Sequence, residues 1–395
     1  MTPATPSLSK TQKICAVALA AYVVFALLVW HLAPRLKLHG SDIWVFRIGL
    51  WLLGLIAAGV VIWLQVRKLA PGGAAAPGVD DIDVTAAAAR TQLAGSRSAR
   101  SAGTSSLAAL PMIVVLGPDG SAKTTTVTRS GLDPELLAGG VMRGDTVAPT
   151  SGINVWYSQG TVFLEAGGPA FANSARFARV IRHAQPGRLR AVFGSGAQPP
   201  RLAVACMSCE EFLKTGASES VMGLARAMRE RLSQLSRALG VQLPVYVIFT
   251  KADRIPYFAD FVQNLSNDEA REVLGVTLAP DVGATGLYAD RQTARVGGAF
   301  DQLFRSLAEK RLQFLARENA AERRPGAYEF PRELRKIMPL AQEFLVELCK
   351  PSQLQVSPFL RGFYFAGVRA VIITESAVAA APVGRRAQGG PVGAT

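Results

Sequence analysis

The feature that most constrains this chain is a glycine-rich turn between an apolar stretch and a threonine-rich stretch. Residues 113–116 are Ile-Val-Val-Leu and predict a buried strand, and residues 117–124 read Gly-Pro-Asp-Gly-Ser-Ala-Lys-Thr. A strand that enters a helix through such a loop directs backbone N–H groups and the helix dipole at one anion. The turn is typical of a phosphate-binding loop, in which Lys123 would contact the β- and γ-phosphates and Thr124 would bind Mg²⁺.

The predicted phosphate-binding residues form one set around this turn, and one of them departs from the usual pattern. The pattern is Gly, four residues, Gly, Lys and Ser or Thr, and Ala122 stands at the second glycine. A Cβ there narrows the approach of the backbone to a phosphate and disfavours positive φ, so we expect weaker binding. A glycine-rich turn without a ligand is the alternative. The set is Gly117, Asp119, Gly120, Ser121, Ala122, Lys123, Thr124 and Thr125.

A second motif follows an apolar strand at residues 161–164. The strand leads into Glu165-Ala-Gly-Gly168, at the place where GTPase-like domains carry Asp-x-x-Gly. In that arrangement the carboxylate holds Mg²⁺ through water, and the glycine N–H contacts the γ-phosphate. We therefore predict that Glu165 is a metal residue and that Gly168 is a nucleotide residue.

A third motif closes the apolar strand at residues 245–249 and reads Thr250-Lys251-Ala-Asp253, where GTPases carry Asn-Lys-x-Asp. The Asp would accept hydrogen bonds from a guanine edge, and the Lys stem would pack on the base. We predict that Thr250, Lys251 and Asp253 bind nucleotide, although an Asp after a strand is also often a helix cap. Because Thr250 replaces the more telling asparagine, the sequence leaves open whether the cofactor bound with Mg²⁺ is GTP or ATP.

Between the first two motifs, residues 143–152 form a polar segment that a GTPase would use as a switch. Thr150 or Thr146 would offer a hydroxyl to Mg²⁺, and Thr150 is the third predicted metal residue; a plain polar loop is an equal alternative. Pro169 stands where Ras-like enzymes have a water-orienting Gln, and its side chain has no donor or acceptor. We assign no catalytic residue and expect at most a weak NTPase.

Two apolar runs near the N-terminus, residues 14–30 and 48–64, are 17 residues each and carry no charged side chain. At about 1.5 Å per residue each run is about 26 Å long, close to the thickness of the bilayer core once flanking residues are added. They predict a transmembrane hairpin with spans at about 12–33 and 45–66. A signal peptide and a soluble core hairpin are the alternatives. Because nucleotide is cytosolic, both termini would be cytoplasmic.

The charge balance and the cysteines bear on possible partners. The chain has 43 Lys+Arg and 29 Asp+Glu, a net charge of +14. The basic residues are scattered and do not interleave with aromatics, which argues against nucleic acid and favours anionic lipid or a solvated surface. Cys206 and Cys209 form a CxxC without a second pair, so we predict two buried thiols and not a zinc site.

Strands that alternate with helices predict an α/β fold, in which a two-helix transmembrane hairpin is followed by a P-loop GTPase-like parallel sheet domain and a helical subdomain. Apolar periodicity predicts helices at 221–239, 300–316 and 332–348, the last with Pro331 at its start. The expected domains are the hairpin at 1–68, a linker at 69–108, the NTPase-like domain at 109–285, the helical subdomain at 286–369 and a disordered tail at 370–395.

Several sequence blocks, taken in order, carry a resemblance to a known family. The two apolar runs and the phosphate loop come first, and Pro244–Asp253, a strand with Thr-Lys-x-Asp, follows. Glu329-Phe-Pro-Arg-Glu333 and Ser357–Phe365, which contains Leu-Arg-Gly-Phe-Tyr-Phe, come later. Together these blocks resemble the type VI secretion membrane subunit family TssM, also called IcmF-like, over most of the chain.

The resemblance implies a multi-pass component of the bacterial inner membrane in a contractile injection apparatus. Its partners would be TssL-like and TssJ-like subunits, the baseplate and further copies of itself. The nucleotide domain would act as a switch or scaffold; the alternatives are a membrane-tethered GTPase or ATPase devoted to hydrolysis, and a structural anchor with an inactive site. The family continues into a third span and a periplasmic domain, whereas this sequence ends at Thr395. That ending indicates a truncated or split frame, or a separate periplasmic chain.

Overall fold

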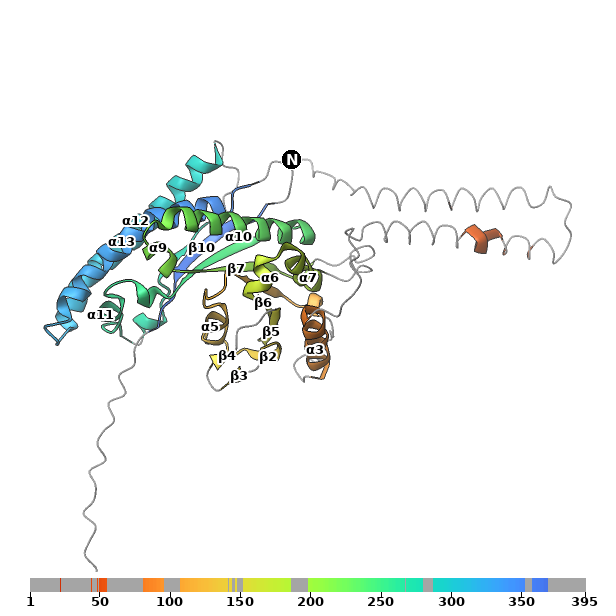
Figure 1. Cartoon of the computed structure of the whole chain (residues 1–395), viewed down its shortest axis with the longest axis horizontal. Coiled ribbons are helices and arrows are strands. Elements are labelled where there is room, and N and C mark those ends of the chain that lie inside the picture. Colours follow the sequence, from red (N-terminus) through yellow and green to blue (C-terminus); the bar gives the residue numbers. More distant parts are fainter. Residues whose placement is uncertain are drawn as a thin grey trace, which may run out of the picture. The chain divides into compact units, whose positions relative to one another are not determined.

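The fold is described from a computed structural model of the chain (Figure 1). The chain divides into two compact units, one formed by Met1–Asp80 with Pro186–Ala197 and the other by Asp81–Gln185 with Gln198–Thr395. The structure describes residues 22, 44, 48, 50–54, 81–95, 107–140, 142–143, 146–147, 152–185, 198–266, 268–279, 287–351 and 357–368.

The predicted transmembrane hairpin is wrong for the described part of the first unit. No helix among the described residues is long and apolar enough to cross a membrane. The Tyr22 hydroxyl donates a hydrogen bond to the Trp51 carbonyl oxygen over 3.4 Å. The rest of the two predicted spans lies outside the described residues.

The second unit is built on a mixed eight-stranded sheet with the order β2-β5-β6-β1-β7-β8-β10-β9 (Figure 1). Five neighbouring strands, from β6 to β10, are parallel, whereas β2, β5 and β9 pair antiparallel. The strands are β1 (Met112–Leu116), β2 (Glu135–Ala138), β5 (Ile153–Ser158), β6 (Thr161–Ala166), β7 (Arg201–Ser208), β8 (Pro244–Thr250), β9 (Gly275–Thr277) and β10 (Phe359–Phe365), and β3 (Met142–Arg143) pairs with β4 (Thr146–Val147) in a separate ribbon.

The mixed sheet corrects the prediction of a parallel one. β5 and β6 are joined by only two residues, Gln159 and Gly160, which have φ of 46° and 80°. Two positive φ values in a two-residue loop are typical of a tight hairpin turn, which can join only antiparallel strands. The hairpin therefore places β5 beside β6, next to the strand that carries the second motif.

The two faces of the sheet bury hydrophobic clusters of different size. Successive residues of β1 face opposite sides: Val114 and Leu116 belong to the main core, whereas Val115 belongs to a smaller cluster with Val127 of α5. Among the described residues, the helices of eight or more residues are α3 (Asp81–Gly95), α7 (Ser174–Ala184), α10 (Ala217–Leu239), α12 (Tyr288–Arg317) and α13 (Arg324–Leu348). The shorter α-helices described are α5 (Lys123–Thr128), α6 (Gly168–Ala172), α9 (Glu210–Leu213) and α11 (Phe258–Val262).

The helix predicted at 221–239 is confirmed and forms the greater part of α10. Its apolar side chains recur at three-to-four spacing and are buried in the main core, as an amphipathic helix requires. α10 packs against α13 and α7 (Figure 1). The buried residues on this face include Val221, Ala225, Met228, Leu232 and Leu235.

α3 lies inside the segment that the sequence analysis expected to be a linker. Ile82, Ala86, Ala89 and Leu93 are fully buried in the main core, and their spacing places them on one helix face. The helix packs against β2, β5 and α7. The first described residues of the second unit are therefore part of its core.

The stretch expected to be a helical subdomain shares its core with the sheet. Both predicted helices are present and longer than expected, as α12 and α13. β10, from the same stretch, lies in the sheet beside β8. Phe300 of α12 packs against Phe363 of β10, with ring centroids 4.4 Å apart and the ring planes tilted by 31°. The predicted tail at 370–395 lies outside the described residues.

Candidate functional site

The phosphate loop, residues 117–124, connects the end of β1 to α5, which begins at Lys123. Gly117 has no room for a side chain, because a Cβ there would lie 2.4 Å from the Cys206 carbonyl oxygen. Ala122 has a left-handed backbone, with φ 54° and ψ 30°. For a residue with a Cβ this conformation costs about 1–2 kcal/mol. Ala122 therefore adopts a backbone conformation that favours glycine, at the position where the usual motif has glycine.

Lys123 is buried, with 6% of its surface exposed, and its amino group is turned back onto the loop. Nζ donates to the carbonyl oxygens of Gly117, at 3.0 Å, and Pro118, at 2.7 Å, and lies 3.5 Å from the Ser121 hydroxyl. Burial lowers the pKa of Lys123 below its ordinary value. A phosphate oxygen is a stronger acceptor for an ammonium group than a carbonyl oxygen, so an anion in the loop would compete for these bonds.

Two of the predicted metal residues lie together. The Thr124 hydroxyl donates to Glu165 Oε1 over 2.5 Å, and the Glu165 side chain is almost fully buried. Glu165 Oε2 accepts from Asn154 Nδ2 at 3.2 Å and from Trp156 Nε1 at 3.1 Å. Thr150, the third predicted metal residue, lies outside the described residues. Neither donor on β5 was predicted from the sequence, although the lone Asn in the apolar run Ile153–Tyr157 was an available signal.

Other predicted phosphate residues surround the same loop. A Cβ at Gly168, the first residue of α6, would lie 2.7 Å from the Asp119 Cβ, so the second motif abuts the loop. The Gly120 N–H donates to Asp119 Oδ1 over 3.1 Å, and the Ser121 hydroxyl donates to the Pro118 carbonyl over 2.8 Å. Thr125 lies in α5 and is exposed.

The Thr-Lys-Ala-Asp loop, residues 250–253, is joined to the phosphate loop by a direct hydrogen bond. The buried Thr250 hydroxyl contacts the Ser121 carbonyl oxygen at 3.0 Å and the Met207 carbonyl oxygen at 3.3 Å. Because a hydroxyl can donate to a carbonyl as an amide N–H can, Thr250 keeps a tie between the two loops. Two predicted sites far apart in sequence are therefore adjacent.

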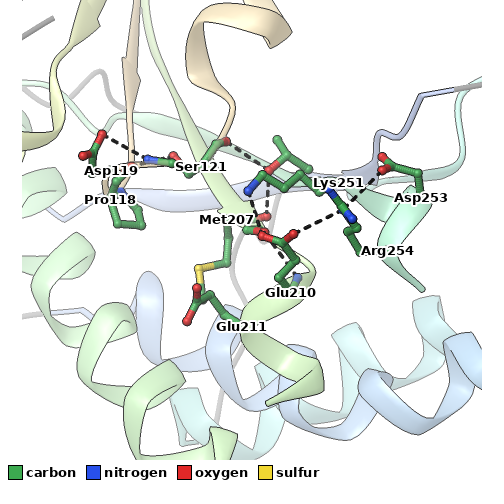
Figure 2. A network of polar contacts seen from close by, with 12 residues as sticks. Pro118, Asp119, Ser121, Met207, Glu210, Glu211, Lys251, Asp253 and Arg254 are labelled. Atoms are coloured by element: carbon green, nitrogen blue, oxygen red, sulfur yellow. Dashed lines mark hydrogen bonds and ion pairs between the residues drawn. The ribbon is translucent and has the colours of Figure 1, made fainter. Parts of the chain in front are cut away.

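Charged side chains of this loop meet an acidic residue that the sequence analysis missed (Figure 2). Lys251 Nζ lies 2.7 Å from Glu210 Oε2, and Arg254 Nε lies 3.3 Å from Glu210 Oε1. The hydrogen bond from Lys251 is the main cause that lowers the pKa of Glu210. Asp253 Oδ1 accepts the Val368 N–H over 3.1 Å, so this predicted base-binding carboxylate has a backbone partner. Glu210 follows strand β7, and Thr250 ends the neighbouring parallel strand β8. Because parallel strands end at the same edge of the sheet, the sequence could have predicted that Glu210 lies near this loop.

The residues present fit a magnesium ion that arrives with a nucleotide. Among the described residues, no group of three or more His, Cys, Asp and Glu side chains could hold a metal ion. Mg²⁺ in triphosphate sites commonly takes one or two protein oxygens and completes its shell with phosphates and water. The Thr124 hydroxyl and the Glu165 carboxylate are hard oxygen ligands of that kind.

The two thiols of the CxxC pair are buried, as predicted. Cys206 and Cys209 are both fully enclosed, and burial raises the pKa of Cys206 to about 12 and that of Cys209 still further. A thiol with so high a pKa is protonated at neutral pH and is a poor nucleophile and metal ligand. Both thiols therefore belong to the interior, Cys209 in the main core and Cys206 in the smaller cluster with Val115 and Val127.

Comparison with known proteins shows which proteins the chain resembles. Residues 203–391 match the model of the IcmF-related N-terminal domain. Over 260 residues the chain is 32% identical to the "Type VI secretion system component TssM1" of Pseudomonas aeruginosa. The match covers 65% of this chain and 23% of that protein, so the chain spans about a quarter of its length. The chain is TssM/IcmF-like, which confirms the resemblance carried by its motifs.

Proposed function

We propose that this chain is a component of a type VI secretion apparatus, and that its sheet domain binds a purine nucleoside triphosphate with Mg²⁺ as a switch or scaffold. The similarity to TssM1, whose name assigns it to that system, supports the first part. The motif order and the contacts at the carboxyl edge of the sheet support the second. In open α/β sheets, ligands bind at this edge.

One observation carries the nucleotide proposal. Lys123 and Thr124 begin the helix that follows β1, Glu165 lies on the neighbouring strand β6, and all three lie beside one glycine-rich loop. A buried cation that is bonded only to neutral acceptors is poorly compensated, and a triphosphate would compensate it. The adjacent hydroxyl and carboxylate would take the accompanying Mg²⁺.

Slow turnover, if any, follows from two residues. Pro169, next to Gly168, offers no side-chain group to orient an attacking water. Ala122 adds a methyl group at a left-handed position of the loop. These features favour a protein that changes state on binding over a rapid hydrolase. A structural anchor with an inactive site is the second candidate, favoured by Ala122 alone.

The proposal extends to partners and location. TssL-like and TssJ-like subunits, the baseplate and further copies of this chain are the proposed partners, at the bacterial inner membrane. The basis is the resemblance to TssM, a family of secretion membrane subunits. Co-purification of the chain with a TssL-like subunit, compared between wild type and Lys123→Ala, distinguishes a nucleotide switch from an anchor. A switch loses or gains partner binding on substitution, whereas an anchor does not.

Calorimetric titration of the purified chain with GTP and with ATP, each with Mg²⁺, tests the nucleotide site. We expect Lys123→Ala to weaken binding at least about tenfold, because a charge-assisted contact contributes about 1.5–3 kcal/mol. Lys214→Ala is the matched control, because Lys214 is exposed and paired only with Glu211. Absence of heat with both triphosphates would overturn the nucleotide proposal. Rapid hydrolysis by the chain alone would favour a true NTPase.

A further inference from the structure

We propose that Asn154 and Trp156 are positioning residues for the metal of this site: they hold one oxygen of Glu165 and leave the other to Thr124 and the cation. The inference rests on the proposed nucleotide site and assigns a different role to each of the two Glu165 carboxylate oxygens. Both donors come from β5, the strand that the sequence analysis did not connect with the site.

The register of the β5–β6 hairpin explains how the two donors reach the carboxylate. Asn154 lies directly opposite Glu165, and Trp156 lies opposite Phe163, two residues away on the same face. Side chains at directly opposed and diagonal positions of an antiparallel pair are within contact distance. Both donor side chains have only 1% of their surface exposed.

The bonding divides the carboxylate into two unlike oxygens. Oε2 accepts two N–H groups, from Asn154 and Trp156, whereas among the described residues only the Thr124 hydroxyl donates to Oε1. Two N–H hydrogens directed at Oε2 would repel a cation from that oxygen. Oε1 is therefore the oxygen that Glu165 can present to Mg²⁺, either directly or through a water molecule.

The two donors Asn154 and Trp156, which we call the clamp, also compensate for the length of the Glu165 side chain. Glu165 stands where a shorter Asp is usual, and its extra methylene adds one rotatable bond that a metal site must immobilise. The two N–H groups fix the longer side chain. Asn154 is itself fixed, because its Oδ1 accepts the Gly140 N–H over 2.8 Å and this orients Nδ2 towards Glu165. The chain thus supplies in β5 the rigidity that a shorter carboxylate would not need.

Magnesium dependence of nucleotide binding tests the clamp. Trp156→Phe removes one N–H group and keeps an aromatic ring, and Asn154→Leu removes the other in a similar volume. We expect either change to raise the Mg²⁺ concentration for half-maximal nucleotide binding about tenfold or more, the usual loss when a partner of a metal ligand is removed. Binding measured in EDTA should stay the same, because Lys123 and the loop are untouched.

Tyr157→Phe is the matched control, since Tyr157 is on the opposite face of β5 and belongs to the main core. Thermal melting must show that each variant is folded. Unchanged Mg²⁺ dependence in both folded variants would overturn the clamp while leaving the nucleotide site intact. If the wild-type chain binds no nucleotide, the proposed function itself fails, and the inference fails with it.

The Trp156 indole N–H gives a second readout, which is measured on the wild-type protein and uses a variant only to assign the signal. The other tryptophans are Trp30, Trp44, Trp51 and Trp63, so Trp156 is the single one after residue 63. Its NMR signal can be assigned as the one that Trp156→Phe removes. We expect this signal to move when Mg²⁺ is added to nucleotide-bound protein, because a cation at Oε1 withdraws charge from Oε2 and weakens the bond. A signal that stays fixed while Mg²⁺ strengthens nucleotide binding would contradict the clamp.

Discussion

The phosphate loop and the Thr-Lys-Ala-Asp loop lie side by side, yet they hold their lysines in opposite ways. Lys123 is buried and bonded to carbonyl oxygens of its own loop. The Lys251 side chain is about one-third exposed, at 32%, and pairs with Glu210, at 34%. One loop therefore keeps a cation among neutral acceptors, and the other keeps a cation beside an anion at the surface.

This difference bears on which loop is poised for an anion. A buried cation whose direct hydrogen bonds go only to neutral oxygens is costly even with the Glu165 and Asp119 carboxylates nearby, whereas an exposed ion pair contributes little to stability. We infer that the phosphate loop carries strain that a ligand relieves, and that the Thr-Lys-Ala-Asp loop is balanced without one. Substitutions in the first loop should therefore have large effects, and substitutions of charges in the second should have small ones.

The largest effect is expected from Gly117→Ala. A Cβ would lie 2.4 Å from the Cys206 carbonyl oxygen and 2.7 Å from the Ser121 hydroxyl oxygen, and the Cys206 backbone cannot turn aside as a flexible side chain could. Overpacking of this kind costs about 1–3 kcal/mol, and it should also displace the loop enough to abolish nucleotide binding. Chemical denaturation and calorimetry measure the two effects. Gly223→Ala in α10, where nothing lies within 4 Å of the added Cβ, is the control and should be neutral or stabilising.

Alkaline pH should weaken nucleotide binding through Lys123. Burial lowers its pKa below the ordinary 10.5, so in the free protein the ammonium loses its proton at a lower pH than in the unfolded chain. Affinity for a triphosphate should therefore fall as the pH rises through the lowered pKa, by about 1.5–3 kcal/mol in all. The stability of the free protein has the opposite sign, because the buried charge that penalises the fold is lost. Lys251→Ala should show the same alkaline loss of binding; a pH-independent affinity would remove Lys123 from the site.

Thr250→Val tests the bond between the two loops. The valine fills a similar volume but leaves the buried Ser121 carbonyl oxygen without this donor. An unsatisfied buried acceptor costs about 1–2 kcal/mol, and nucleotide affinity should fall as the loops lose their register. Thr250→Ser keeps the hydroxyl and should restore most of the loss. Equal stability of the valine and serine variants, measured by denaturation, would argue that the loops are independent.

Much of this site could be predicted from short sequence segments, because the backbone conformation of each segment depends mainly on its own residues. The strand–loop–helix at β1 and α5 is dictated by the apolar run and the glycine-rich turn, and α10 by its apolar periodicity. What these residues bind stays a prediction. The sequence predicted only roughly that Thr250 lies near Ser121, because parallel strands end at the same edge of a sheet. The hydrogen bond between them depends on the exact register of the strands, which the sequence does not give.

The missed features depend on contacts between distant segments. Asn154 reaches Glu165 only because a two-residue turn folds β5 back on β6, and the positive φ of Gln159 is not a usual choice for that residue. Pro331 was expected to begin a helix, but α13 begins at Arg324 and includes Pro331. Buried packing of Phe330 and its neighbours against other helices outweighs the cost of an internal proline.

A smaller gain is expected from Ala122→Gly. Glycine adopts the left-handed conformation of this position freely, so the substitution should stabilise the chain by up to about 1 kcal/mol. Binding of a triphosphate should tighten as well, because the methyl group no longer faces the loop. Ala178→Gly in the exposed interior of α7 is the control and should destabilise by about 1 kcal/mol. A loss of stability in Ala122→Gly would show that the alanine is not strained.

A small effect, without loss of nucleotide binding, is expected from Glu210→Gln, which keeps the shape of the side chain and removes its charge. Two partly exposed ion pairs are lost, with Lys251 and Arg254, and each pair contributes only about 0.2–1 kcal/mol. The pKa of Glu210 is lowered in the fold, so its contribution is present above the ordinary value of 4.5 and is lost as the pH falls through the lowered pKa. The difference between wild type and variant in denaturation should therefore vanish in acid and shrink in high salt. A cost above about 2 kcal/mol at neutral pH would instead place the Thr-Lys-Ala-Asp loop in the same energetic class as the phosphate loop. The contrast between a strained and a balanced loop would then have to be abandoned, whatever nucleotide the site accepts.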